Sequence, residues 1–135
     1  MKVLAIDTAT EGCSVCLWQD DESLSRMQVQ PRKHAELILP MIDEVLTEAQ
    51  VKLNQIDTLA FGRGPGAFTG VRIATGVIQG IAYGADSPVV PVSTLRALAQ
   101  RAYIEHQATK VLSAFDARMN EVYLGGFELD ADALM

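Results

Sequence analysis

The residues of this chain that could do chemistry gather at strand ends and in one glycine-rich loop. Asp7 and Thr8 close an apolar run at the N-terminus, and Gly64 and Gly66 lie in a loop that follows another apolar run. A carboxylate at a strand end can orient a hydrated magnesium ion, and glycines let backbone N–H groups approach a phosphate. These four residues are therefore the candidate nucleotide-binding residues. Asp116 ends a later apolar run in the same way, and turn-capping is the alternative role for both acids.

The glycine-rich loop spans residues 62–72 and reads GRGPGAFTGVR. It lies between a predicted strand and a predicted helix, where the helix dipole favours an anion. However, no Lys-Ser or Lys-Thr pair ends the loop, and its spacing is not G-x-G-x-x-G, so neither common phosphate-binding motif is present. A tight strand-to-helix turn packed against a neighbouring segment is the simpler interpretation, because glycine marks turns more often than it binds phosphate.

The remaining reactive side chains predict neither a catalytic centre nor a metal site. Cys13 and Cys16 form a single C-x-x-C inside a predicted strand, which places them on opposite faces, so we expect two inert thiols. His34 begins a predicted helix, where it could cap or pair, and His106 lies among polar residues. Neither histidine has a local pattern of catalytic partners.

The hydrophobic periodicity predicts an α/β fold that would position these residues. The first three strands form an antiparallel meander, and the fourth is expected to be central and parallel to the first. Ser93 is the expected cap of the last helix, and the Gly125-Gly126 pair indicates a possible bulge. The predicted strands are residues 2–8, 13–19, 23–30, 55–61, 88–92, 110–115 and 121–129, and the predicted helices are 34–50, 71–83 and 94–105.

The helix after the glycine-rich loop carries Gly76, Gly80 and Gly84 along one ridge. Each interior glycine costs about 1 kcal/mol relative to alanine, so the ridge needs a structural reason. Close packing onto the chain's own sheet or the preceding helix is one explanation, and a seam with a partner subunit is the other. The candidate partner-interface residues are Ile73, Gly76, Val77, Gly80 and Gly84, with Leu37 and Met41 from the preceding helix.

Size and charge restrict the classes of function. The 135 residues are 49% hydrophobic and carry a net charge of −6, which argues against direct binding of a nucleic acid because phosphate neutralisation needs a basic face. No apolar run is long enough to span a membrane. Asp7 interrupts the apolar stretch that a signal peptide would need, so we expect a soluble cytoplasmic protein.

A strand–turn–strand pattern with an acid at the end of the first strand occurs twice, at residues 2–19 and 110–129. The second occurrence is not followed by further strands. We therefore predict one complete lobe at residues 1–106 and the start of an incomplete second lobe at residues 107–135. An open strand in the second part, either 110–115 or 121–129, is expected to pair with a neighbouring molecule.

Four segments together resemble the bacterial TsaB (YeaZ) family, in order along the chain. They are IDTAT at 6–10, HAE followed by LP at 34–40, GPGAFTGVRI at 64–73 and DARMNEVY at 116–123. The one departure in the loop is Ala67, where serine is usual. The resemblance implies an actin/Hsp70-like ATPase fold built from two ribonuclease-H-like lobes. Because members of the family are longer, it also suggests that this sequence is a fragment.

The resemblance further implies a non-catalytic partner of the paralogue TsaD in the machinery that installs threonylcarbamoyl on adenosine 37 of tRNA. The implied partners are TsaD, the ATPase TsaE and, for the chain alone, a second copy, with tRNA reached only through the complex. No cofactor is implied for the chain itself, although ATP or ADP with magnesium could bind in the assembled complex. The paralogue's His-x-x-x-His metal motif is missing, because residues 93–98 read STLRAL. The alternative is a nucleotide-binding hydrolase or a glycoprotease-like peptidase.

Overall fold

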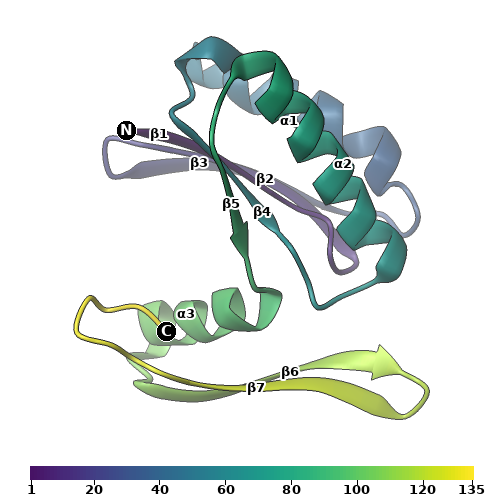
Figure 1. Cartoon of the computed structure of the whole chain (residues 1–135), viewed down its shortest axis with the longest axis vertical. Coiled ribbons are helices and arrows are strands. Elements are labelled where there is room, and N and C mark those ends of the chain that lie inside the picture. The colour runs from purple at the N-terminus through teal and green to yellow at the C-terminus, as the bar shows by residue number, and fades with distance from the viewer.

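The computed structural model describes all 135 residues as two layers, a five-stranded mixed sheet under two helices and a two-stranded hairpin under a third helix (Figure 1). The predicted elements are all present, and the α/β class is confirmed. In chain order the elements are β1 (Lys2–Asp7), β2 (Gly12–Gln19), β3 (Glu22–Val29), α1 (His34–Ala49), the 3-10 turn η1 (Leu53–Gln55), β4 (Thr58–Gly62), α2 (Phe68–Ala85), β5 (Val89–Val92), α3 (Thr94–His106), β6 (Lys110–Arg118) and β7 (Glu121–Glu128).

The larger sheet has the strand order β3-β2-β1-β4-β5. β1, β2 and β3 form the predicted antiparallel meander, since tight turns join them. β4 runs parallel to β1, and β5 runs parallel to β4, because a helix carries the chain back before each of these strands. The prediction that β4 is central and parallel to the first strand is confirmed.

One face of this sheet carries the core of the molecule. Strand alternation turns Leu4, Val15 and Leu59 toward α1 and α2, where they meet side chains such as Ile38 and Ile78 in one buried cluster. Both helices lie over this face in Figure 1. The opposite face includes the Asp7 side chain, which lies against Gly62 of the neighbouring strand.

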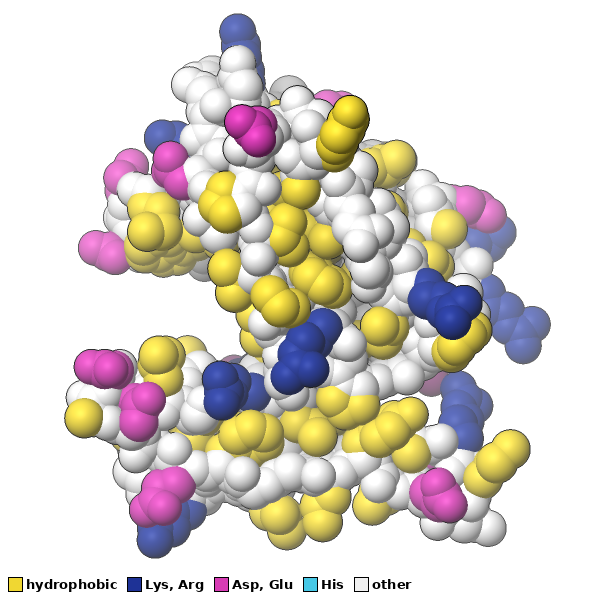
Figure 2. Space-filling view, viewed as in Figure 1, with side chains coloured by type: hydrophobic (Ala, Val, Ile, Leu, Met, Phe, Trp, Pro, Cys, Tyr) yellow, Lys and Arg dark blue, Asp and Glu magenta, His cyan; other side chains and the backbone are white.

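The second layer consists of α3 and the β6–β7 hairpin. Ser93 caps α3 as predicted, accepting a hydrogen bond from the Arg96 amide at 3.4 Å. α3 packs against β6 and β7. The predicted lobe boundary at 106/107 assigns α3 to the first lobe and the hairpin to the second. Figure 2 shows a hollow between this layer and the larger sheet, with hydrophobic side chains on both of its sides.

The predicted bulge at Gly125-Gly126 is wrong. These glycines pair regularly with β6, and the register irregularity lies instead between Asp116 and Arg118. There the Asp116 carboxylate accepts a hydrogen bond from the Arg118 amide at 2.7 Å, and Arg118 takes a positive φ as the chain turns toward β7. A local side-chain hydrogen bond of this kind competes with regular strand pairing.

Candidate nucleotide corner and partner face

Asp7 lies at the end of β1 in close contact with the next strand. Its Oδ1 accepts a hydrogen bond from the Ala9 amide at 2.8 Å. Its carboxylate lies so near the Gly62 backbone of β4 that a Cβ at position 62 would collide with it. Burial raises the pKa of the Asp7 carboxyl, and the bond from Ala9 acts in the opposite direction. Gly62 was not predicted as a site residue, although a glycine ending the strand parallel to β1 is the signal that could have found it.

The glycine-rich loop closes directly onto the turn between β1 and β2. Thr8 Oγ1 donates a hydrogen bond of 2.5 Å to the Gly70 carbonyl, and the Ala67 amide donates one of 2.8 Å to the Ala9 carbonyl. A Cβ at Gly70 would collide with the Thr8 carbonyl oxygen, and one at Gly66 would collide with the Ala9 carbonyl oxygen. The interpretation of the loop as a tight turn packed against a neighbouring segment is confirmed.

Gly64 has a different role in the same loop. Its φ of +91° is a conformation that side chains disfavour, which explains the glycine. Its carbonyl accepts a hydrogen bond from the Thr94 amide at 3.0 Å, and so it ties the loop to the start of α3. The loop therefore contacts the β1–β2 turn on one side and the second layer on the other.

The structure thus brings Asp7, Thr8, Gly64 and Gly66 to one corner of the larger sheet, and the chain's own backbone occupies much of that corner. The absent Cβ atoms of Gly66 and Gly70 make room for residues 8 and 9 rather than leaving a free glycine face for a phosphate. No three His, Cys, Asp or Glu residues are grouped so that they could hold a metal ion. Nucleotide binding by Asp7, Thr8, Gly64 and Gly66, in this chain or in an assembly, stays a prediction.

The other candidate reactive residues do not join this corner. Asp116 is exposed and belongs to the other sheet. Burial raises the pKa of both thiols, at Cys13 with a further contribution from the Asp7 charge, which keeps them protonated and unreactive. His34 is buried, with its Nε2 2.8 Å from the Thr10 carbonyl oxygen, and holds the start of α1 against the β1–β2 turn.

The glycine ridge of α2 faces open space. A Cβ at Gly76, Gly80 or Gly84 would meet no atom within 4 Å, so packing of this ridge onto the chain's own sheet or onto α1 is wrong. Tyr83, 94% exposed, projects beside the ridge. Ile73 and Val77 are half-buried along its edge. We refer to Gly76, Gly80, Gly84, Tyr83, Ile73 and Val77 as the α2 face.

The two α1 residues proposed for the same interface differ from one another. Leu37 is half-buried against the core and keeps some surface. Met41 is 1% exposed, so its assignment to a surface interface is wrong. It lies one helical turn from Ile38 and Val45, and all three turn toward the sheet.

None of the three helices combines the length and the apolar character required to cross a membrane.

Comparison with known proteins places the chain in a family. Residues 27–134 match the family model described as TsaD, tRNA N6-adenosine threonylcarbamoyltransferase. The chain is 49% identical over 134 residues to tRNA threonylcarbamoyladenosine biosynthesis protein TsaB of Escherichia coli, and 54% identical over 123 residues to that of Haemophilus influenzae. The chain belongs to the TsaB (YeaZ) branch of this family. These alignments cover 99% and 91% of the chain but only 58% and 52% of the two TsaB relatives.

Solved structures agree with membership of the TsaB family. YeaZ from Pseudomonas aeruginosa superposes with a TM-score of 0.94 at 52% identity, covering 99% of this chain and 63% of that one. RuvC of Thermus thermophilus, in complex with a Holliday junction substrate, superposes with a TM-score of 0.50 at 14% identity, covering 74% of this chain and 69% of RuvC. The second likeness is one of fold alone. The predicted ribonuclease-H-like, actin-like ATPase fold is confirmed.

Proposed function

We propose that this chain acts as a non-catalytic partner subunit in the biosynthesis of threonylcarbamoyladenosine at position 37 of tRNA. The observation that carries the proposal is its 49–54% identity to two proteins named for that biosynthesis. The packed corner at Asp7 supports a partner role rather than a catalytic one, because the chain's own backbone occupies much of it.

The proposed docking surface for the catalytic paralogue TsaD is the α2 face. It is open along its whole glycine ridge, and helices without side chains at their contact can approach one another closely. Ile73 and Val77 add apolar area at the edge of the ridge, and Tyr83 adds an aromatic ring of the kind enriched at interfaces. The same face would serve for a homodimer when the chain is alone, so the two assemblies would compete.

The rest of the proposed assembly follows from the same assignment. TsaE joins the complex. This chain contacts tRNA only as part of the complex, which is consistent with its net charge of −6. The location is cytoplasmic, where tRNA modification takes place. ATP or ADP with magnesium binds in the assembled complex rather than to the isolated chain, with Asp7 as the carboxylate of this chain nearest the shared site.

The test of this proposal is co-purification of the chain with its TsaD paralogue. Gly80→Arg places a long charged side chain in the centre of the α2 face and should weaken binding at least about tenfold. Gly126→Arg is the matched control, because position 126 is also open but lies on β7. Binding of the Gly80→Arg variant with unchanged affinity would show that the α2 face is not the docking surface.

Assays of the isolated chain distinguish the partner role from the alternative, a nucleotide hydrolase or a peptidase. Turnover of nucleotide that disappears in Asp7→Ala, by a chain that fails to bind the paralogue, would replace the partner role with hydrolysis. Hydrolysis of peptides by the isolated chain would do the same in favour of the peptidase.

A further inference from the structure

The N-termini of α1 and α2 meet at one end of the larger sheet. The Ala67 amide, just before α2, donates a hydrogen bond to the Ala9 carbonyl, and His34, the first residue of α1, has its Nε2 2.8 Å from the Thr10 carbonyl oxygen. Both helices therefore start beside consecutive residues of the turn between β1 and β2. Four exposed cations belong to the segments that meet here, and we refer to them as the basic cluster: Arg32, Lys33, Arg63 and Arg72.

Charge is distributed unevenly between the two ends of this layer. The end with the basic cluster has two exposed acids, Glu11 and Glu36, besides the half-buried Asp7. The opposite end has only Lys2 and Lys52 against eight exposed acids, which lie in the β2–β3 turn, on the last two turns of α1 and just before β4 and β5: Asp20, Asp21, Glu22, Asp43, Glu44, Glu48, Asp57 and Asp86. The net charge of −6 is thus an average over an acidic end and a locally positive one.

The basic cluster is available to a ligand. Arg32, Arg63 and Arg72 form no ion pair within the chain. Lys33 pairs with Glu36 at 3.4 Å, and both side chains are exposed. An exposed pair of this kind contributes little to stability, so another anion can replace Glu36 beside Lys33.

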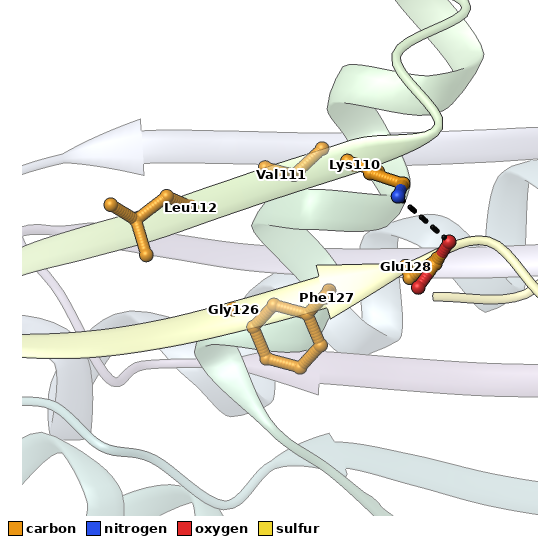
Figure 3. Close-up of a pocket in the computed structure, with 6 residues that line it drawn as sticks. All are labelled: Lys110, Val111, Leu112, Gly126, Phe127 and Glu128. Carbon is orange, nitrogen blue, oxygen red and sulfur yellow. Dashed lines mark ion pairs between the residues drawn. The ribbon is translucent and has the colours of Figure 1, made fainter.

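Two cations of the second layer show the contrast. Arg101 lies 2.7 Å from the Glu105 carboxylate. Lys110 lies 3.3 Å from the Glu128 carboxylate, beside an open hollow of the hairpin (Figure 3). The charge of these two cations is offset within the chain, whereas that of the three arginines in the basic cluster is not.

Phe68 adds an aromatic ring at the same end of the sheet. It is the first residue of α2, and its side chain is 69% exposed. The Arg72 guanidinium folds back one helical turn over this ring and lies 3.8 Å from its centroid. Nucleic-acid bases stack on aromatic rings and on guanidinium planes, while the phosphates pair with cations. The Phe68–Arg72 pair therefore offers a stacking surface beside positive charge.

We propose that the basic cluster and Phe68 form the surface with which this chain contacts RNA. The four cations neutralise phosphates of a loop segment, and the Phe68–Arg72 pair stacks on an unpaired base. The acidic opposite end repels the phosphate backbone, and so it fixes the side from which the RNA approaches. An acidic protein segment would match the cations but not the stacking pair. The assignment of this RNA to tRNA rests on the proposed function.

The size and the place of this surface fit a shared contact. Four cations neutralise roughly four phosphates, which gives weak binding to the chain alone and adds to the contacts of a partner subunit. Phe68 and Arg72 also precede the α2 face along the same helix. With a paralogue docked on the α2 face, RNA bound at the basic cluster would lie at the border of the two subunits, where both can contact it.

The test measures tRNA binding by the complex of this protein with its TsaD paralogue, over a series of salt concentrations. Arg63→Gln/Arg72→Gln should weaken binding at least about tenfold at about 0.1 M salt and lower the slope of log K against log salt by about 0.7 for each cation removed. Phe68→Leu should weaken binding about tenfold with an unchanged slope, because stacking neutralises no phosphate. Phe68→Tyr keeps the ring and should bind as the starting protein does.

Lys52→Gln is the matched control, because Lys52 is an exposed cation at the acidic end of the same layer. It should change neither the affinity nor the slope. An equal effect of Lys52→Gln would mean that only the total charge matters, and it would overturn the proposal. Unchanged tRNA binding by the Phe68→Leu and Arg63→Gln/Arg72→Gln variants would do the same.

Co-purification with the paralogue is measured for every variant and should be unaffected. Loss of this binding in Phe68→Leu or Arg63→Gln/Arg72→Gln would show that the surface contacts protein instead of RNA. Failure of the proposed function gives a different result, in which the starting protein itself does not bind the paralogue. In that case an RNA hairpin with a single-stranded loop, added to this chain at low salt, should shift the NMR signals of residues 32–36 and 62–72 and not those of residues 43–57. Shifts at neither end, or at both, would overturn the proposal.

Discussion

The larger sheet and the β6–β7 hairpin begin in the same way and reach opposite environments. Each starts with a strand that carries an acid at or near its end and returns through an antiparallel partner. All 15 residues of the buried core cluster belong to the layer of the larger sheet, because β4, α1 and α2 cover β1 there. The hairpin packs against α3, and the C-terminal tail hydrogen-bonds to Gln100 of that helix. The two motifs therefore differ in how much of the described chain packs against them.

The largest difference between the two layers should appear on truncation of a leucine. Leu59 in β4 is 0% exposed, and Leu124 in β7 is 57% exposed. We expect Leu59→Ala to lower the free energy of unfolding by about 4 kcal/mol, through lost burial and the cavity that remains. Leu124→Ala should lower it by less than about 0.5 kcal/mol. Urea denaturation of both variants measures the difference, and equal losses would show that the hairpin is as tightly packed as the sheet.

Glycine-to-alanine changes within α2 should separate the packed end of the helix from its open face. Gly70→Ala places a Cβ against the Thr8 carbonyl, and we expect it to lower the free energy of unfolding by about 3 kcal/mol. Gly76→Ala meets open space and should raise it by up to about 1 kcal/mol through helix propensity. Thermal and urea unfolding of the two variants give the comparison. A stabilised Gly70→Ala variant would contradict the close contact with Thr8.

Asp7 at the end of β1 and Asp116 near the end of β6 should differ in how they respond to substitution. Because the folded pKa of Asp7 is raised by burial, its contribution to stability is fully present below the unfolded value of 3.8 and is lost as pH rises through the folded pKa. At neutral pH the ionised Asp7 is therefore destabilising, and Asp7→Asn should be more stable than the starting protein. The advantage should vanish as pH falls below 3.8.

Asp116→Asn is the control for this prediction. Asp116 is exposed, so the substitution should change the free energy of unfolding by less than about 0.5 kcal/mol. Chemical unfolding of both variants at several pH values provides the measurement. A loss of stability for Asp7→Asn at neutral pH would mean that the hydrogen bond from Ala9 outweighs the effect of burial.

The sequence predicted the elements of this fold because each has a clear hydrophobic period, including the parallel placement of β4. It predicted the start of α2 three residues too late, since Phe68–Gly70 lie in a glycine-rich stretch and yet are helical. The openness of the glycine ridge depends on how α1 and α2 are spaced on the sheet, which no local pattern encodes. For the same reason Met41 was assigned to the surface although its helical position turns it toward the core.

The sequence predicted which residues meet at the candidate corner, but it did not predict how the backbone packs there. Asp7, Thr8 and the glycines follow strands, so their convergence at one sheet edge could be expected. Gly66 packs against Ala9, and Gly70 packs against Thr8. These contacts could not be predicted, because contacts between distant backbone segments leave no periodic signal in the sequence.

The hydrogen bond from Thr8 to Gly70 also constrains the order in which the chain folds. Its two residues are 62 positions apart, so forming it closes a long loop whose entropy must be offset by contacts made at the same time. The β1–β2–β3 meander needs only short loops, and it can form first. We expect Thr8→Val to accelerate unfolding with little effect on the refolding rate, a φ-value near zero in stopped-flow kinetics. The corner that joins the two halves of the sheet would then be completed after the transition state.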